Sequence, residues 1–216
     1  SSYSASFTPS NNSTSDGVIS VASGVFSDSA GNTNNDDADP NNSVRFTIDT
    51  VSPTIAISDD DPDHSLTTGE TSTLTFSLSE PSTDFLQSDI SISGGTLSNW
   101  TAHSSSSYSA SFTPSNNSTT DGVISVGSDT FSDLAGNTNN DGSDANNSVT
   151  LSVNTIRPTI AINDDDADDS LSVGDTSTLT FTLSEASTDF SESDVSVSGG
   201  ALSNFSGSGS SYSATF

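Results

Sequence analysis

The sequence has 216 residues, no cysteine, two basic residues and 29 acidic ones, so its formal net charge at pH 7 is −27. This excess argues against nucleic acids and anionic membranes as partners, because both bind positively charged surfaces. The lack of cysteine excludes disulfides and thiolate metal sites, and no apolar run approaches the roughly 18 residues of a membrane span. The acidity favours bound cations, with a solvated acidic surface as the alternative explanation.

An internal repeat of about 105 residues organises the chain. Tyr3 recurs as Tyr108 and, after one deletion, as Tyr212, and residues 53–80 match residues 158–185 at three quarters of their positions. A repeat of this length indicates tandem domains. We expect residues 1–52 to be the C-terminal half of one repeat, residues 53–157 a complete repeat, and residues 158–216 the N-terminal half of the next. Because the pattern is interrupted at both ends, we expect a piece of a longer polypeptide.

Apolar side chains alternate with Ser and Thr along short segments, as in Leu74, Phe76 and Leu78, which is typical of half-buried strands. Gly94-Gly95 predicts a turn. The complete repeat contains seven such segments, at residues 54–58, 71–79, 89–93, 96–102, 107–113, 122–126 and 148–154. The sequence therefore predicts an all-β fold of tandem seven-stranded immunoglobulin-like β-sandwich domains. Trp100 and its counterpart Phe205 are expected in the core.

The two half repeats lack the strands of the other half. Each would expose an apolar sheet face and unpaired strand edges. We therefore expect the halves to be poorly stable alone or to complement one another, more easily between two chains than within one.

Acidic residues gather in the connections between the predicted strands. Asp59, Asp60, Asp61 and Asp63 follow the first strand, at the end of the sandwich where the last strand finishes. Glu80 and Asp84, together with the connection 132–147, lie at the opposite end. Across a four-residue linker, the first cluster of one domain would then face Glu185 and Asp189 of its successor.

Crowded carboxylates are costly without a cation, and calcium takes six to eight oxygen ligands. Calcium is therefore the expected cofactor, magnesium fits less well, and the pattern is not an EF-hand. The alternative is an acidic turn without an ion. Asp133, Asp141 and Asp144 form a second candidate group within one domain. The full set of candidate ligands is Asp59, Asp60, Asp61, Asp63, Glu80, Asp84, Asp133, Asp141, Asp144, Asp164, Asp165, Asp166, Asp168, Glu185 and Asp189.

The residues do not predict an enzyme. A hydrolytic triad needs a histidine near a nucleophile, yet the only histidines are His64, which Asp169 replaces in the next repeat, and His103, which lies in a loop of variable length. The competing function is a ligand-binding module for a carbohydrate or a receptor. Near-identical tandem copies favour a spacer over such a module.

Five motifs, in order along the chain, resemble the bacterial immunoglobulin-like repeats of giant secreted RTX-type and biofilm-associated adhesins. They are T-I-A-I-x-D-D-D, G-E/D-T-S-T-L-T-F-x-L-S-E, S-D-I/V-S-I/V-S-G-G-x-L-S-N, Y-S-A-S/T-F-T-P and F-S-D-x-A-G-N. The resemblance implies a protein secreted to the bacterial cell surface, with many tandem copies that calcium often rigidifies, and it implies no catalysis. We expect extender repeats whose partners are neighbouring repeats, with no nucleic acid, no direct membrane insertion, and a host or surface ligand bound by another domain.

Overall fold

The computed structural model describes residues 2–36 and 39–216, which divide into one unit ending at Thr155 and a second from Ile156 to Phe216. Strands and short 3-10 helices make up its regular structure. No helix in these ranges is long and apolar enough to cross a membrane.

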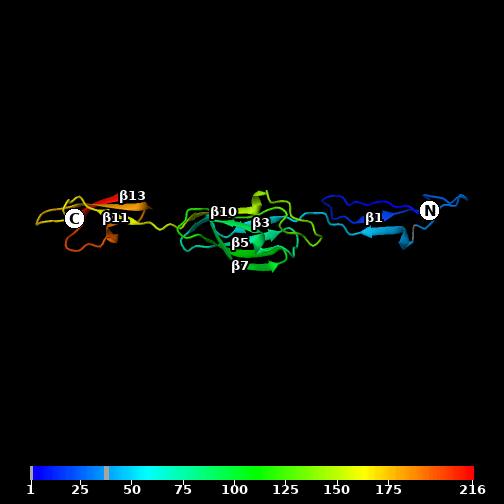
Figure 1. Ribbon diagram of the computed structural model, residues 1–216, viewed down its shortest axis with the longest axis horizontal. Coiled ribbons are helices and arrows are strands. Elements are labelled where there is room, and N and C mark those ends of the chain that lie inside the picture. The colour runs from blue at the N-terminus through cyan, green and yellow to red at the C-terminus, as the bar shows by residue number, and fades with distance from the viewer. Residues whose placement is uncertain (1, 37–38) are drawn as a thin grey trace. The chain divides into compact units, whose positions relative to one another are not determined.

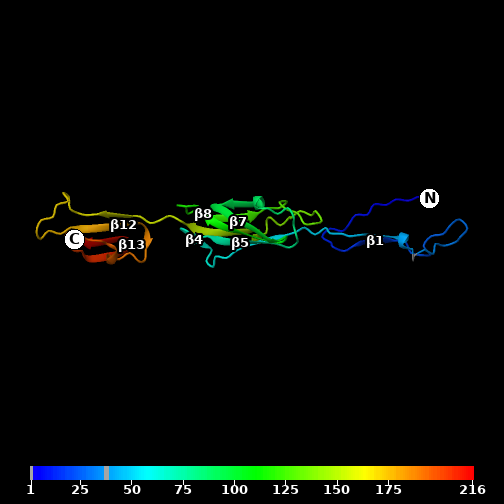
Figure 2. The same ribbon diagram turned by 90° about the horizontal axis from the view of Figure 1, so that it is seen from below.

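The complete repeat is a sandwich of two four-stranded sheets (Figures 1 and 2). One sheet has the order β3-β5-β8-β7 and the other the order β4-β10-β9-β6. All neighbours are antiparallel except β4 and β10, which are parallel. This distribution of strands matches the immunoglobulin sandwich and confirms the predicted fold class. The strands are β3 (Ile55–Asp59), β4 (Ser65–Thr67), β5 (Ser72–Leu78), β6 (Ile90–Ser93), β7 (Gly95–Ser104), β8 (Ser107–Pro114), β9 (Gly122–Val126) and β10 (Ser148–Asn154).

The repeat has eight strands, so the prediction of seven was wrong by one. The additional strand, β4, is three residues long and contributes a single buried side chain, Leu66. Three residues are too few to show a period of two. Its position depends on pairing with β10, where Leu66 lies opposite Val153.

Side chains from both sheets fill the core. In β5, Leu74, Phe76 and Leu78 face inward. Phe85, between β5 and β6, has its ring centroid 5.7 Å from that of Trp100, 5.1 Å from Tyr108 and 5.2 Å from Phe131. Trp100 packs against this buried cluster, which confirms its predicted core role.

The two glycines after β6 behave differently from one another. Gly94 has φ +73° and makes the predicted turn, a conformation that glycine adopts readily. Gly95 already belongs to β7, one residue earlier than predicted. A Cβ atom on Gly95 would lie 2.5 Å from the Phe112 ring, so the absence of a side chain lets β7 pass over the core.

Polar side chains organise the long connection between β9 and β10. Ser132 and Thr138 form an isolated bridge. Asn139, fully buried, accepts hydrogen bonds from the backbone N–H groups of Thr130 and Phe131 and donates to the Gly127 carbonyl. The 3-10 helix η3 (Ala145–Asn147) ends the connection. These hydrogen bonds and the bridge hold the connection in a defined conformation.

In the N-terminal part, β1 (Gly17–Ser20) pairs antiparallel with β2 (Ser43–Phe46). The 3-10 helix η1 (Pro40–Asn42) lies directly before β2. The unit from Ile156 has one three-stranded sheet of order β11-β12-β13, formed by β11 (Ile160–Asn163), β12 (Thr178–Ser187) and β13 (Ser203–Thr215). It also contains η4 (Glu192–Asp194), the counterpart of η2 (Gln87–Asp89) in the complete repeat. Both half repeats expose large apolar side chains, as predicted.

Candidate metal centre

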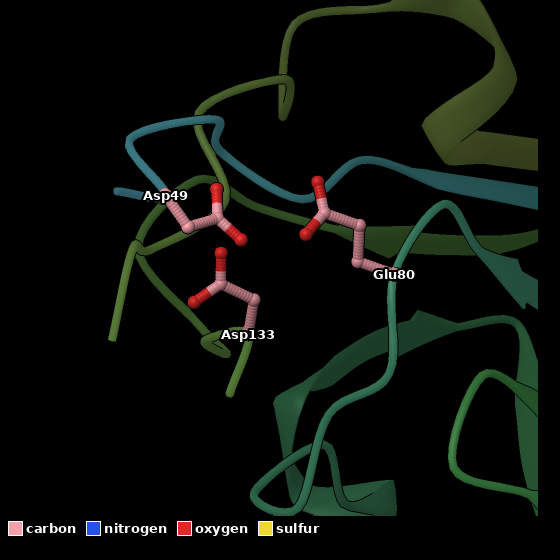
Figure 3. Close-up of side chains that lie close together, drawn as sticks. All are labelled: Asp49, Glu80 and Asp133. Carbon is pink, nitrogen blue, oxygen red and sulfur yellow. The ribbon is translucent and has the colours of Figure 1, made fainter. Parts of the chain in front are cut away.

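Three acidic side chains converge where the chain enters the complete repeat (Figure 3). Asp49 lies in the segment between β2 and β3, Glu80 follows β5, and Asp133 lies in the β9–β10 connection. One carboxylate oxygen from each lies within 4.8 Å of those from the other two. Within residues 2–36 and 39–216, no other three acidic or histidine side chains come this close together. The structure thus brings together the predicted Glu80 and Asp133 and adds Asp49.

Asp133 is held by the turn that follows it. Its Oδ1 accepts hydrogen bonds from the N–H groups of Ala135 (2.8 Å) and Asn137 (2.9 Å), and its Oδ2 accepts from Asn137 Nδ2 at 2.7 Å. Burial disfavours the charged carboxylate, but these bonds, led by those from Asn137, lower the pKa of Asp133 on balance. Asp133 is therefore ionised at neutral pH although its side chain is buried.

Asp49 is tied to the same turn. Asn137 Nδ2 also donates to the Asp49 carbonyl oxygen at 3.3 Å, and Asp49 Oδ1 accepts from the Val51 N–H group at 3.1 Å. One asparagine therefore fixes both Asp133 and the backbone beside the Asp49 carboxylate.

Within the described residues, no hydrogen bond offsets the effect of burial on the pKa of Glu80. Its pKa is raised, first by burial and then by the negative charges of Asp49 and Asp133. Two neighbouring anions and partial burial both oppose its ionisation. A cation bound between the three carboxylates would reverse this electrostatic penalty.

The predicted aspartate cluster after β3 has a different arrangement. Asp60 Oδ1 accepts from the Thr73 N–H group at 2.6 Å, and this bond leads those that lower the pKa of Asp60. Asp59 contacts His64 Nδ1 at 3.0 Å, Asp61 accepts from the Ser65 N–H group at 2.9 Å, and Asp63 lies in the intervening turn. Each bonded carboxylate supports the β3–β4 turn or the start of β5, and the structure does not gather them around one point.

Of the three further predicted ligands in the complete repeat, Asp84 and Asp141 accept hydrogen bonds from the protein. The Asp84 carboxylate accepts hydrogen bonds from the N–H group of Ser132 (2.9 Å) and from Ser132 Oγ (2.5 Å). Burial disfavours the charged form of Asp84, but these bonds lower its pKa on balance. Asp141 is buried and accepts from the Ile55 N–H group at 2.7 Å. Asp144 is exposed. None of the three joins the group around Asp49.

The sequence profile of the bacterial Ig-like domain matches residues 49–153 and 154–216. The chain belongs to this family. The first matched domain begins at Asp49, so all three converging carboxylates belong to one bacterial Ig-like domain.

No curated protein sequence matches the chain significantly. The solved structures that are similar to it include a bacterial adhesin and a bacterial integrin-binding protein. One is FdeC, an Escherichia coli adhesin, with 17% identity and a TM-score of 0.40, covering 86% of this chain and 61% of that chain. The other is invasin, a bacterial integrin-binding protein, with 16% identity and a TM-score of 0.40, covering 80% of this chain and 36% of that one. The chain therefore spans less than two thirds of either structure.

In the second bacterial Ig-like domain, the predicted aspartates again have local roles. Asp165 accepts from the Thr178 N–H group at 2.7 Å, Asp164 from the N–H group of Asp166 at 2.9 Å, and Asp166 from that of Asp168 at 3.1 Å. Glu185 and Asp189 line one surface depression. Their predicted pairing with the cluster Asp59–Asp63 stays a prediction.

Sequence reasoning missed Asp49. The residue stands in a linker whose counterpart in the next repeat is Asn154, so comparing the repeats hides it. The usable indication was topological: the linker reaches the sandwich at the end that carries Glu80 and Asp133.

We expect Glu80→Gln to raise the melting temperature of the complete repeat in chelator at pH 7. The folded pKa of Glu80 lies above its ordinary value of 4.5, so ionised Glu80 destabilises the fold as pH rises through that region, and glutamine removes this penalty. Melts followed by fluorescence of Trp100, the single tryptophan, would measure the change. The gain should disappear near pH 3, where Glu80 is protonated in both states; an equal gain at both pH values would contradict the electrostatic explanation.

Proposed function

We propose that this chain is a structural extender, or spacer, segment of a bacterial cell-surface adhesin, in which calcium stiffens the junctions between bacterial Ig-like domains. The convergence of Asp49 from the linker with Glu80 and Asp133 from the following domain carries this proposal. An ion bound by all three would fix the linker to the domain that it enters.

Hydrogen bonds already limit the freedom of this linker. On one side, Thr50 Oγ1 donates to the Ser10 carbonyl oxygen at 2.7 Å and accepts from the Ser13 N–H group at 2.9 Å. On the other side, the Asp49 carbonyl accepts from Asn137. Two adjacent residues are therefore bonded to successive parts of the chain, as suits a spacer that must resist bending.

The same anchor recurs after the complete repeat. Thr155 is buried, and its Oγ1 donates to the Ser115 carbonyl oxygen at 2.7 Å and accepts from the Ser118 N–H group at 2.9 Å. Thr68 Oγ1 donates to the Thr155 carbonyl oxygen at 3.0 Å. Repetition of this device at corresponding positions supports a role in setting the length and stiffness of a tandem array.

The donors at Asp49, Glu80 and Asp133 suit calcium. They are all carboxylate oxygens, which hard divalent cations prefer. Because hydrogen bonds already use both oxygens of Asp133 and one of Asp49, the three side chains would supply part of the six to eight ligands that calcium takes, and carbonyl groups or water would supply the rest. Flexible coordination of this kind favours calcium over magnesium.

The test is thermal unfolding of the 216-residue chain in calcium, in magnesium and in chelator, followed by Trp100 fluorescence. Calcium at a hundredfold excess over its dissociation constant should stabilise the repeat by about 2.7 kcal/mol, and magnesium by much less. Asp49→Asn and Asp133→Asn should each remove most of the calcium response. Asp121→Asn, which removes one charge from an exposed aspartate in the β8–β9 connection, is the matched control and should keep it.

A melting temperature indifferent to calcium would overturn ion stiffening and assign the acidic residues to a solvated surface. The competing function, a carbohydrate- or receptor-binding module, would be favoured by saturable binding of such a ligand to this chain. Under our proposal, another domain of the parent protein binds the host or surface ligand, and neighbouring repeats are the direct partners of this one.

A further inference from the structure

The first and last strands of the complete repeat advance side by side in the same direction. β3 begins at Ile55, whose N–H group donates to Asp141, a residue of the connection that leads into β10. The chain then reaches β4, which pairs in parallel with the end of β10, Ser65 lying opposite Ser152. The chain therefore enters the sandwich near the start of β10 and leaves it at the end of β10, so the two linkers meet the repeat at opposite ends.

This geometry determines what tension between the two linkers does. Tension on the linker before Ile55 draws β3 and β4 backward along their own axes, whereas tension on the linker after Asn154 draws β10 forward. Because β4 and β10 are paired neighbours, they are pulled past each other parallel to their strands. Hydrogen bonds of a parallel ladder are evenly spaced along the strands, so this displacement strains all of them together. A hairpin pulled open from one end would instead lose its bonds one at a time.

Hydrogen bonds keep the connection between β3 and β4 from straightening under load. The Asp59 carboxylate lies 3.0 Å from His64 Nδ1, and Asp61 accepts from the first N–H group of β4 at 2.9 Å. After β4, the Glu70 carboxylate accepts from both the N–H group and Oγ1 of Thr67 at 2.8 Å. Both ends of β4 are therefore fixed to their turns, and tension on β3 reaches β4 directly.

The pairing of β4 with β10 is closed at both ends. Just before β4 begins, the His64 carbonyl oxygen accepts from the Ser152 N–H group at 2.8 Å. Just after β4, Thr68 Oγ1 donates to the carbonyl oxygen of the first residue after β10 at 3.0 Å. Between these bonds, Leu66 and Val153 lie opposite one another and are both buried. The ladder is short, but its inner side is shielded from water.

We propose that β4 and β10 form a mechanical clamp, in which this parallel ladder carries tension along the chain and sets the force at which the repeat unfolds. The inference rests on the proposed spacer role, because only a chain held at both ends loads the ladder. The connection from β3 and this one ladder form the shortest path between the linkers. By contrast, β6 pairs with β9 alone, and neither of these strands adjoins a linker.

Metal bridges across chosen strand pairs test the clamp. Ser65→His combined with Ser152→His places two imidazoles on register partners of β4 and β10, at exposed positions. The matched control combines Ser91→His with Ser125→His, which are register partners in β6 and β9. Nickel binds imidazole and should bridge each pair. Because the chain contains no cysteine, one cysteine added at each end attaches the 216-residue chain for pulling at constant force.

Unfolding of the complete repeat is recognised by the length released, since residues 53–157 extend to about 350–380 Å. Nickel at a hundredfold excess over its dissociation constant should slow this step about 100-fold for the β4–β10 bridge, because that bridge must break before the sandwich opens. The same excess should leave the rate unchanged for the β6–β9 bridge, which is still intact when the clamp ruptures. Nickel should raise the melting temperature of both variants, which shows that each bridge forms in a folded repeat.

A single substitution tests the clamp without a metal. Thr68→Val removes the side-chain bond to the Thr155 carbonyl oxygen and should speed unfolding under force about fivefold, as expected for one hydrogen bond that is lost in the transition state. Thr113→Val, at an exposed position of β8, is the control and should unfold at the rate of the unchanged chain.

Three results would overturn the clamp. An unfolding rate that nickel does not alter in the β4–β10 variant, despite a higher melting temperature, would place the mechanical resistance elsewhere. Equal slowing in both bridged variants would show that the sandwich resists as a whole, and an unchanged rate for Thr68→Val would contradict loading at the end of β10. The unchanged chain in nickel gives the baseline. No step needs calcium, so failure of the clamp differs from failure of calcium stiffening, which the melts in calcium and chelator test.

Discussion

Replacing Phe85 with alanine is expected to lower the free energy of unfolding of the complete repeat by about 3–5 kcal/mol, the range typical of phenylalanine truncations in a core. Phe85 is buried, and its ring contacts those of Phe76, Trp100, Tyr108 and Phe131. Three of these rings belong to strands β5, β7 and β8 of one sheet, and Phe131 belongs to the β9–β10 connection. Truncation would therefore leave a cavity whose walls are held in place by paired strands and by this connection, so they cannot readily collapse.

Urea unfolding followed by Trp100 fluorescence would measure this loss. The control is Leu86→Ala, the next residue along the chain, whose side chain is 56% exposed; its effect should stay within about 0.5 kcal/mol, as for other surface substitutions. A loss below about 1 kcal/mol for Phe85→Ala would show that the aromatic cluster repacks and does not determine the stability of the sandwich.

Alternation along the sequence located most strands of the complete repeat because each strand buries one face. The predicted strands 122–126 and 148–154 match β9 and β10 at both ends. The prediction failed where burial does not govern the backbone. β4 depends on parallel pairing with β10, and β7 continues to Ser104 because it remains paired with β8 across two irregularities.

The half repeats also show that alternation in the sequence does not by itself determine which segments become strands. Residues 195–198 carry the Val-Ser alternation of a strand yet form none, although their counterpart β6 is a strand. The difference is the pairing partner, since β6 bonds to β9. Sequence alternation therefore identifies a segment able to form a strand, and the neighbouring strand decides whether it does.

Topology was more informative about the candidate metal centre than clustering in the sequence. Counting connections placed Glu80 and Asp133 at the same end of the sandwich, and their carboxylates do lie close together. The run Asp59-Asp60-Asp61 looked like a stronger ligand set, but its side chains bond separately to Thr73, His64 and Ser65. Carboxylates that cap turns and carboxylates that bind an ion look alike in a sequence, and calcium binding stays a prediction.

Substitutions at Asp141 distinguish a carboxylate that accepts backbone hydrogen bonds from one that binds an ion. Asp141→Ala is expected to lower the free energy of unfolding of the complete repeat by about 3 kcal/mol even in chelator. Asp141 Oδ2 accepts from the Ile55 N–H group, and Oδ1 accepts from Asn139 Nδ2 at 3.2 Å. Alanine would leave the buried Ile55 N–H group at the start of β3 without this acceptor, at a cost of about 1–3 kcal/mol, and would remove a hydrogen bond to a charged group, which is stronger than a neutral one.

Asp141→Asn should recover much of the loss, because its amide oxygen can still accept from Ile55. Asp144→Ala, at an exposed position in the same connection, is the control and should change stability by no more than about 0.5 kcal/mol. Urea unfolding in calcium and in chelator, followed by Trp100 fluorescence, decides between the roles. A capping role predicts the same loss in both solutions, since the bond to Ile55 needs no ion. A loss confined to calcium would instead make Asp141 an ion ligand and would show that ion binding and not capping explains its burial.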